Sequence, residues 1–224
     1  EDGFRSTMNL VINTSRLYNS LGCAGLAQRA TLVAHGYANH RRAFGQTIIS
    51  YPLVQEMIAG MAATSAALLA GGLTLAHLFD EREAGRLNDE NMGFMRVATN
   101  LVKMRSCQHS HRVVLTGIET LGGNGAIESF SVIPRLLRDN VVYENWEGTH
   151  NTLIAQTHRD FARNGLHTPF LARLRALLAS DDPSLADALG PASEALLRAE
   201  IGLSEVMEHE DPGFSALVLK PHAE

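Results

Sequence analysis

The sequence has few cysteines, few aromatic residues and no excess of positive charge. Only two of its 224 residues are cysteines, Cys23 and Cys107, and each lies in a helical pattern. We therefore expect two small core residues in a reducing compartment, and not a disulfide framework. The net charge is -5 at pH 7. A chain with that balance offers no basic surface, so binding to nucleic acid is not expected.

Strand-like alternation and uninterrupted apolar runs are missing as well. No segment alternates apolar and polar residues convincingly, and there is neither an internal repeat nor a low-complexity tract. The apolar window at residues 62–78 contains Thr, Ser, His and paired Gly at helical spacing. We interpret it as a buried bundle helix and not as a membrane span. Hydrophobic residues make up 45% and charged residues 19%, which is typical of a globular chain that buries a real core.

Helical periodicity is what the sequence has in quantity. Helices are predicted at residues 7–41, 52–80, 89–121, 133–140 and 149–163. The predicted inward stripe of the first helix consists of Leu10, Thr14, Leu17, Leu21, Ala24 and Gln28. Three helices of about 30 residues joined by short turns pack antiparallel. The predicted fold is therefore all-α, with an antiparallel up-down four-helix bundle over residues 1–163.

Residues 164–224 are predicted to form a helical C-terminal extension. Its first amphipathic helix is expected at residues 170–178. Asp182 and Pro183 are a good cap and first-turn pair for another, which runs to about His209. Pro212 and Gly213 are predicted to break that helix, and the residues after them show no clear pattern.

Two glycines, Gly22 and Gly25, lie in the middle of the first predicted helix. Each is expected to destabilise the helix by about 1 kcal/mol relative to alanine. Such glycines are useful where a neighbouring backbone or a ligand comes close. We therefore expect a close approach at this level of the helix.

Glu147 is the first candidate for chemistry, because it lies between Trp146 and Gly148 just before a predicted helix. A carboxylate buried beside a large aromatic ring, without a counter-charge, is a plausible general base, since burial makes a carboxylate more basic. The alternative is an acidic residue that is stabilised by the dipole at a helix N-terminus. The local context alone favours the second interpretation.

Two further motifs are open in the same way. The glycine turn at residues 122–125 either brings backbone N–H groups against a phosphate or is a helix C-cap followed by a tight turn. It lacks the G-x-G-x-x-G spacing after a strand, which excludes a Rossmann dinucleotide site. Arg41 and Arg42 either hold a pyrophosphate through their paired guanidinium donors or form a solvated helix end.

Four stretches taken together identify a family. They are Arg16 with Gly25-Leu26-Ala27-Gln28-Arg29-Ala30, Arg41-Arg42-Ala43-Phe44-Gly45-Gln46, Glu119-Thr120-Leu121-Gly122-Gly123-Asn124-Gly125, and Leu137-Arg138-Asp139 with Trp146-Glu147-Gly148-Thr149. With these stretches in this order and spacing, the chain from near Gly3 to Ala162 resembles the C-terminal helical domain of flavin-dependent acyl-CoA dehydrogenases. The Glu-x-Leu-Gly-Gly-Asn-Gly version resembles the branch that includes the alkylation-response flavoproteins.

The resemblance implies an FAD enzyme that converts an acyl-CoA thioester to a trans-2-enoyl-CoA. Glu147 matches the catalytic base that removes the α-proton, its backbone N–H helps to bind the thioester carbonyl, and the β-hydride goes to flavin N5. The implied cofactor contacts are Arg41, Phe44, Glu119, Gly122, Gly123, Trp146, Thr149 and Asn151. The implied substrate contacts are Arg16, Asn13 and Gly148, and no metal site is expected.

The resemblance also implies partners and a setting in fatty acid metabolism. Bundles of this family pack into dimers or tetramers, so Arg41, Phe44, Glu119 and Gly123 would reach the FAD of a neighbouring subunit. An N-terminal helical domain and a middle β-domain, which these 224 residues do not contain, are expected on the same or another chain. Without them we expect poor FAD binding and no activity. Electrons would pass to an electron-transfer flavoprotein or a similar acceptor, in the cytoplasm or, in a eukaryote, in the mitochondrial matrix.

Three positions depart from the family's pattern. Glu119 stands where many members have a Gln that donates toward the pyrophosphate. Ala126 replaces the usual aromatic residue after the glycine turn, and Pro52 falls where a cofactor-contacting Gln often lies. An ionised carboxylate at position 119 would repel a phosphate, so we expect Glu119 to point away or to pair with Arg41 or Arg42, or the cofactor to follow a different path.

Two other functions stay open. One is an alkylation-response type of flavoprotein that associates with DNA, and the other is a non-catalytic oligomerisation bundle. DNA association would require a cluster of Lys and Arg on the extension. There the basic residues Arg173, Arg175, Arg198 and Lys220 stand among many acidic ones, which gives that alternative little support.

Overall fold

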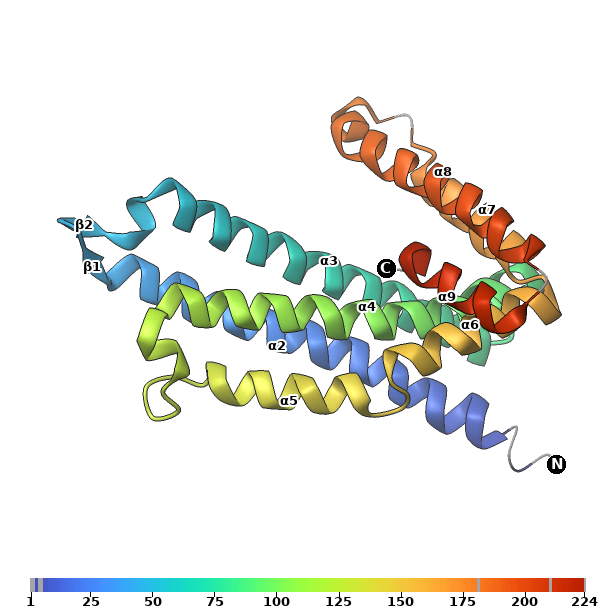
Figure 1. The fold of residues 1–224 in the computed structure, drawn as a ribbon, viewed down its shortest axis with the longest axis horizontal. Helices are drawn as coiled ribbons and strands as arrows, with labels where there is room; N and C mark the ends of the chain where they lie inside the picture. The colour runs from blue at the N-terminus through green and yellow to red at the C-terminus, as the bar shows by residue number, and fades with distance from the viewer. Residues whose placement is uncertain (1–2, 4–5, 181, 210, 224) are drawn as a thin grey trace. The chain divides into compact units, whose positions relative to one another are not determined.

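The computed structural model describes residues 3, 6–180, 182–209 and 211–223, and it is helical almost throughout (Figure 1). The elements in chain order are η1 (Thr7–Ile12, a π-helix), α2 (Asn13–His40), β1 (Arg42–Ala43), β2 (Gln46–Thr47), η2 (Ile48–Ser50), α3 (Pro52–Glu83), α4 (Asp89–Leu121), η3 (Gly122–Ala126), α5 (Ile133–Asn145), α6 (His150–Asn164), α7 (His167–Leu178), η4 (Pro183–Leu185), α8 (Ala186–Glu208) and α9 (Pro212–Ala223). The predicted all-α fold is confirmed, and the third helix has the predicted bounds.

The chain divides into two compact units. The first consists of Glu1–Ala76 with Val102–Thr149, and the second of His77–Leu101 with His150–Glu224. Helices α3 and α4 contribute residues to both. The domain boundary predicted after residue 163 stays a prediction, because a division by contacts within one chain does not test which segment folds by itself.

The first unit is a bundle of α2, α3, α4 and α5. Its core is formed by Ala24, Ala27, Ala30, Ala34, Ile58, Met61, Leu68, Val113, Val114, Leu121, Ile133 and Leu136. The part that α2 contributes is alanine throughout, and small side chains at a contact let helix axes approach closely. The chain reverses direction at the hairpin between α2 and α3 and again at the glycine turn between α4 and α5 (Figure 1), as an up-down bundle requires.

The inward stripe of α2 differs from the predicted one. Leu10 lies before α2 in η1 and is 60% exposed, and Gln28 is exposed as well. The buried residues of α2 are Arg16, Asn19, Ser20, Cys23, Ala24, Ala27, Ala30, Ala34 and Ala38. The predicted stripe was wrong at Leu10 and Gln28, and the side chains that α2 buries are small or polar.

The prediction that both cysteines are core residues is confirmed. Cys23 and Cys107 are free thiols with no exposed surface, and their Sγ atoms lie 3.6 Å apart between α2 and α4. Next to them, a Cβ at Gly22 would lie 2.9 Å from the ring of Tyr143 on α5. The close approach predicted for Gly22 is therefore confirmed, whereas a Cβ at Gly25 would meet nothing within 4 Å.

A short hairpin between α2 and α3 is an element that the sequence did not reveal. Strands β1 and β2 pair antiparallel, with Arg42 opposite Thr47 and Ala43 opposite Gln46. Phe44 has φ 51° and Gly45 φ 95°, and two successive positive φ values are typical of a type I′ hairpin turn. Strands of two residues are too short to show alternation, which is why periodicity did not predict them.

The second unit has an aromatic core. Phe94 on α4 stacks on Phe170 of α7 with ring centroids 5.4 Å apart, and Phe161 on α6 lies 6.2 Å from the same Phe170 ring. The buried carboxylate of Asp160 accepts two hydrogen bonds from the Arg96 guanidinium, at 2.9 and 2.6 Å. These contacts join α6 and α7 to the first turns of α4.

The predicted break before Pro212 is confirmed, since α8 ends at Glu208, and a further helix, α9, follows it. Pro212 and Gly213 are the first residues of this helix, and the residues after them are helical to Ala223. Proline is tolerated in a first turn because its missing N–H would have no partner there. Leu219 and Ser215 are each only 2% exposed. Burial of these side chains stabilises α9, although the sequence of this short segment shows no clear helical pattern.

Helix α3 has an unusually apolar composition. By length and composition alone it is able to cross a membrane, and 33% of its most apolar stretch is buried within this chain. Core helices of soluble bundles have the same property. Residues 62–78 were interpreted as a buried bundle helix. For the face of α3 that is exposed in this chain, that interpretation stays a prediction.

The second unit is expected to lose stability as the pH falls toward 5, because of His158. Its Nε2 lies 2.5 Å from Ser215 Oγ, which links α6 to α9, and burial lowers the pKa of this histidine. The unfolded chain therefore binds the proton first, so the stabilisation is complete above the unfolded pKa of about 6.5 and declines as the pH falls below it.

Chemical unfolding from about pH 8 to about pH 5 measures this dependence. The matched variant is His158→Gln, which retains a hydrogen-bonding group for Ser215 and does not titrate. Its stability is expected to depend less steeply on pH than that of the wild type. Equal slopes for the two proteins would refute the role of His158.

Candidate functional site

The turn that carries Glu147 has an unusual backbone. Helix α5 ends at Asn145, α6 begins at His150, and the N–H of Trp146 donates to Val142 O at 2.8 Å. Glu147 has φ 59° and Gly148 has φ 106°. A left-handed conformation costs a non-glycine residue about 1–2 kcal/mol and persists only where the surroundings fix it. Glu147 is thus held by its surroundings in a backbone conformation that it would not adopt freely.

Buried side chains of α2 and α4 provide those surroundings. Arg16 Nε donates to Glu147 O at 3.1 Å and Asn19 Nδ2 donates to Trp146 O at 3.3 Å. Lys103 Nζ donates to Glu144 O at 3.0 Å and to Gly148 O at 2.8 Å. Four carbonyl oxygens between residues 144 and 148 are therefore held by three side chains from neighbouring helices.

The resemblance predicted Arg16 as a site residue, and the structure brings it to Glu147. Its side chain is buried, and burial lowers the pKa of the guanidinium while the negative charge of Glu147 opposes that shift. Asn13 lies three residues before Arg16 on the same helix. A role of Arg16 and Asn13 at the mouth of a CoA site stays a prediction, since the contact in this chain is with the turn.

Sequence reasoning missed Asn19 and Lys103. The signal that points to them is a polar residue inside an otherwise apolar or small-residue stripe. Asn19 lies between Arg16 and Cys23 on the buried face of α2, and Lys103 precedes the buried Met104 on α4. Periodicity identifies such positions as inward, but it does not indicate which carbonyl each side chain reaches.

A second polar cluster fixes the end of α5 against α4. His111 Nδ1 lies 2.5 Å from Glu144 Oε1, and Asn140 Nδ2 donates to the same oxygen at 2.8 Å. Asn140 Nδ2 also donates to Cys107 O at 3.1 Å, and its Oδ1 accepts from Ser110 Oγ. The last turn of α5 is therefore anchored where the turn with Glu147 begins.

An exposed apolar surface adjoins this turn. The Trp146 ring is 49% exposed and stacks on Tyr143, with centroids 6.5 Å apart and an interplanar angle of 24°. Val141, Val142 and Asn145 line an open depression together with Trp146. An exposed apolar surface of this kind, next in the chain to the partly buried Glu147, is suited to contact an apolar ligand or another domain.

Five of the predicted cofactor residues lie at the opposite end of the bundle. Arg41 caps the C-terminus of α2 just before the hairpin, and Phe44 lies in the turn of the hairpin. Glu119 lies in the last turn of α4, and Gly122 and Gly123 begin η3 (Figure 1). Asn124 Nδ2 donates to the hydroxyl of Tyr37 at 3.2 Å, which joins the glycine turn to α2 just before the hairpin. Since α2 rises 1.5 Å per residue, the 25 residues from Arg16 to Arg41 separate the two groups by roughly 38 Å.

The hairpin presents an exposed aromatic ring and exposed guanidinium groups, which suit the rings and the pyrophosphate of a dinucleotide. Phe44 is 96% exposed, and the Tyr51 hydroxyl donates to Ala43 O at 2.9 Å and to Phe44 O at 3.1 Å. Arg41 and Arg42 are exposed beside it, and guanidinium groups suit a pyrophosphate. These residues therefore fit FAD.

Glu119 does not fit as a phosphate contact. Its side chain is exposed, and in the part of the chain that the structure describes no ion pair joins it to Arg41 or Arg42. Thr149 and Asn151 are exposed beside the start of α6. Their predicted contacts with the cofactor stay predictions.

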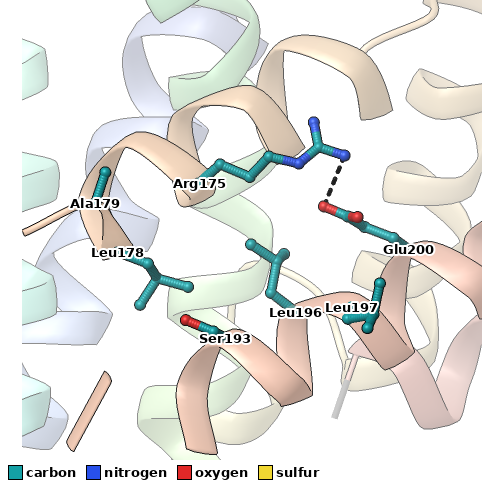
Figure 2. A pocket seen from close by; sticks show the side chains of 7 residues that line it. All are labelled: Arg175, Leu178, Ala179, Ser193, Leu196, Leu197 and Glu200. Atoms are coloured by element: carbon teal, nitrogen blue, oxygen red, sulfur yellow. Dashed lines mark ion pairs between the residues drawn. The ribbon is translucent and has the colours of Figure 1, made fainter. Parts of the chain in front are cut away.

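A cavity of about 270 Å³ lies between α7 and α8 of the second unit (Figure 2). It is lined by Arg175, Leu178, Ala179, Ser193, Leu196, Leu197 and Glu200. The Arg175 guanidinium turns across it toward Glu200, at 2.8 Å. None of the predicted site residues lines this cavity, and among the described residues no group of three or more His, Cys, Asp or Glu side chains is placed to hold a metal ion.

The regions in which known proteins match this chain include the whole first unit and extend beyond it. The family profile "Acyl-CoA dehydrogenase, C-terminal domain" matches residues 1–161. Acyl-CoA dehydrogenase family member 11 of Caenorhabditis elegans is 30% identical over 169 residues, which are 75% of this chain and 27% of that protein. Putative acyl-CoA dehydrogenase AidB of Escherichia coli is 30% identical over 134 residues, 60% of this chain and 24% of that protein. The chain thus spans about a quarter of the length of these relatives.

Two solved structures show how far the fold is shared. Caenorhabditis elegans ACDH-11 in complex with C11-CoA superposes with a TM-score of 0.84 at 26% identity, over 95% of this chain and 37% of that one. An acyl-CoA dehydrogenase of Bacillus anthracis complexed with FAD has a TM-score of 0.65 at 20% identity, over 95% and 48%. The second shows likeness of fold alone. Because both cover 95% of this chain, the C-terminal helices are part of the shared architecture.

Proposed function

Since the chain belongs to the acyl-CoA dehydrogenase family, as its C-terminal helical domain, we propose that it serves an FAD-dependent acyl-CoA dehydrogenase. The reaction is the α,β-dehydrogenation of an acyl-CoA thioester to a trans-2-enoyl-CoA. The observation that carries this proposal is Glu147 in its left-handed turn. Three buried side chains hold the carbonyls of that turn, and the exposed Trp146 directly precedes Glu147 in it.

In this proposal Glu147 accepts the α-proton of the substrate. A general base works best when its position is fixed before the substrate binds, because reacting atoms must approach within about 3–3.5 Å. The backbone N–H of Glu147 is directed to the thioester carbonyl, where negative charge develops as the proton leaves. Trp146 contributes an apolar wall that keeps water from the carboxylate. FAD, when bound, supplies the acceptor for the hydride that leaves the β-carbon.

The hairpin and the glycine turn are proposed to contact the FAD of a neighbouring subunit. The distance of roughly 38 Å between Arg41 and the Glu147 end of α2 supports this, because one flavin does not reach both ends of the bundle. The active form would then be a dimer or a tetramer. It would require the N-terminal helical and middle β-domains, and an electron-transfer flavoprotein or similar acceptor in the cytoplasm or mitochondrial matrix.

DNA association receives no support from the C-terminal helices. Arg175 is paired with Glu200 at 2.8 Å, and Arg198 lies 3.8 Å from Glu194. Two of the four basic side chains on this extension are thus neutralised by carboxylates, and a DNA-binding surface requires several uncompensated cations. The likeness to putative acyl-CoA dehydrogenase AidB therefore supports the family alone.

The test is reduction of the flavin by substrate. Protein that contains the N-terminal and middle domains together with residues 1–224 is expected to be yellow. Under anaerobic conditions, acyl-CoA thioesters of graded chain length are expected to bleach its visible absorbance and to yield the 2-enoyl-CoA. A colourless protein, or a yellow one that no acyl-CoA bleaches, would refute the proposed function.

A further inference from the structure

Lys103 is among the largest fully buried side chains in the described part of the chain, with 0% of its surface exposed. It is one of only two lysines in the sequence, and the other, Lys220, is exposed on α9. Its ammonium donates to Glu144 O at 3.0 Å and to Gly148 O at 2.8 Å. The first carbonyl belongs to the last turn of α5 and the second to the residue after Glu147. A single buried cation thus ties together both ends of the turn that carries the carboxylate.

A buried ammonium is costly, since removal from water disfavours its charge. Burial accordingly lowers the pKa of Lys103. The hydrophobic core of the bundle consists of Ala, Ile, Leu, Met and Val side chains, and an apolar residue at position 103 would avoid that cost. What an apolar residue lacks is the capacity to hold two carbonyl oxygens at once. An ammonium has three rotatable donors and is suited to that task.

The two hydrogen bonds of Lys103 oppose the relaxation of a strained backbone in this turn. Glu147 and Gly148 both have positive φ, at 59° and 106°. Glu147 has a conformation that a non-glycine residue leaves when it is free to do so. Asn19 and Arg16 hold the carbonyls in the middle of the turn, whereas Lys103 holds one carbonyl at each end of it. Without that span, residues 145–148 are free to relax toward an ordinary conformation, which moves the Glu147 carboxylate.

We propose that Lys103 is a positioning residue, which keeps Glu147 in its left-handed turn by bridging Glu144 O and Gly148 O. This inference rests on the proposed function, in which Glu147 is the base. Lys103 acts through the turn and does not touch the substrate or the cofactor. Its loss should therefore reduce kcat while KM and the bound flavin stay unchanged.

The test uses Lys103→Met and Lys103→Arg in protein with all domains present. Methionine fills a similar volume without donors, whereas arginine retains the charge and several donors. Lys103→Met is expected to lower kcat by about 100-fold, the loss typical of a reacting group misplaced by about 1 Å. Its KM for acyl-CoA and its flavin content should stay within about twofold of the wild type. Lys103→Arg is expected to recover at least about a tenth of wild-type kcat, and Lys220→Met, the matched control, should behave as wild type.

Two results would overturn the proposal. One is a Lys103→Met protein that binds flavin and retains kcat within about threefold of the wild type. The other is a loss of kcat in which the arginine variant is as inactive as the methionine variant and flavin content falls in parallel. The first would show that the bridge does not matter for the base. The second would show that Lys103 serves only the fold.

Hydrogen exchange provides a readout that does not depend on activity. In Lys103→Met, peptides covering residues 144–149 are expected to exchange about tenfold faster, while peptides from the cores of α2 and α3 keep wild-type rates. Faster exchange confined to this turn supports the positioning role even if the wild type reduces no acyl-CoA, in which case only the proposed function fails. Unchanged exchange at the turn in an active protein removes the positioning role and leaves the proposed function intact.

Discussion

Replacing Glu147 by glutamine is expected to lower the rate of flavin reduction by acyl-CoA about 1,000-fold, the usual contribution of a well-placed general base. Glutamine has nearly the same shape, and the hydrogen bonds that hold this turn end on backbone carbonyls, not on the Glu147 side chain. The turn should therefore keep its conformation, and FAD and substrate should bind as before. The loss would lie in kcat alone, because the amide does not accept the α-proton. Stopped-flow absorbance under anaerobic conditions measures it.

Glu128→Gln is the matched control for that substitution. Glu128 is exposed in the turn before α5 and pairs with Arg138. Its replacement should leave the rate within about twofold of the wild type, as surface substitutions usually do. Flavin content must be equal in the three proteins for the comparison to hold. If Glu147→Gln retained more than about a tenth of the wild-type rate, the base would have to be another residue.

Replacing Phe161 by alanine is expected to lower the free energy of unfolding by about 3–5 kcal/mol, the usual cost of removing a large aromatic side chain from a core. Phe161 is 2% exposed and its ring lies 6.2 Å from that of Phe170 and 6.1 Å from that of His167. It therefore joins α6 to α7, and its loss leaves a cavity in the second unit. Denaturant unfolding followed by circular dichroism measures the shift of the midpoint.

Phe214→Ala provides the comparison within the same unit. The Phe214 ring is 50% exposed and contacts His209 with centroids 4.7 Å apart, so we expect a loss of about 1 kcal/mol or less. The difference between the two variants measures burial, since both delete the same group. A Phe161 variant that unfolds at the same midpoint as the Phe214 variant would show that the aromatic core does not hold the second unit together.

Long helices were predictable because their signal is local and repeated. Residues 89–121 were predicted as one helix and form α4 with those bounds. Helix α9 and the hairpin were not predicted, and both depend on contacts made by few residues. In α9 the buried side chains include Leu219 and Ser215. In the hairpin, Phe44 and Gly45 form the turn with positive φ angles. Neither a dozen residues nor two-residue strands offer enough repeats for a period to be recognised.

Some residues of the candidate site were likewise predictable from the sequence, and others were not. Glu147, Trp146 and Arg16 were predicted because they belong to stretches with family-specific spacing, and the structure places all three at one turn. Asn19 and Lys103 belong to no such stretch. Their inward direction is visible in the helical pattern, but their partners lie 127 and 45 residues away, so no local rule connects them.

The sequence by itself determined that this protein is a helical bundle, because helical periodicity is a local signal. It also determined which carboxylate is the candidate base, because the family-specific motifs keep their order and spacing along the chain. The tertiary structure alone decided how that carboxylate is held. It brings Arg16, Asn19 and Lys103 from two other helices to the carbonyls of residues 144–148 and fixes Glu147 at φ 59°. A strained backbone conformation of this kind depends on donors that are distant in sequence, and only the packing of the helices brings them within hydrogen-bonding distance.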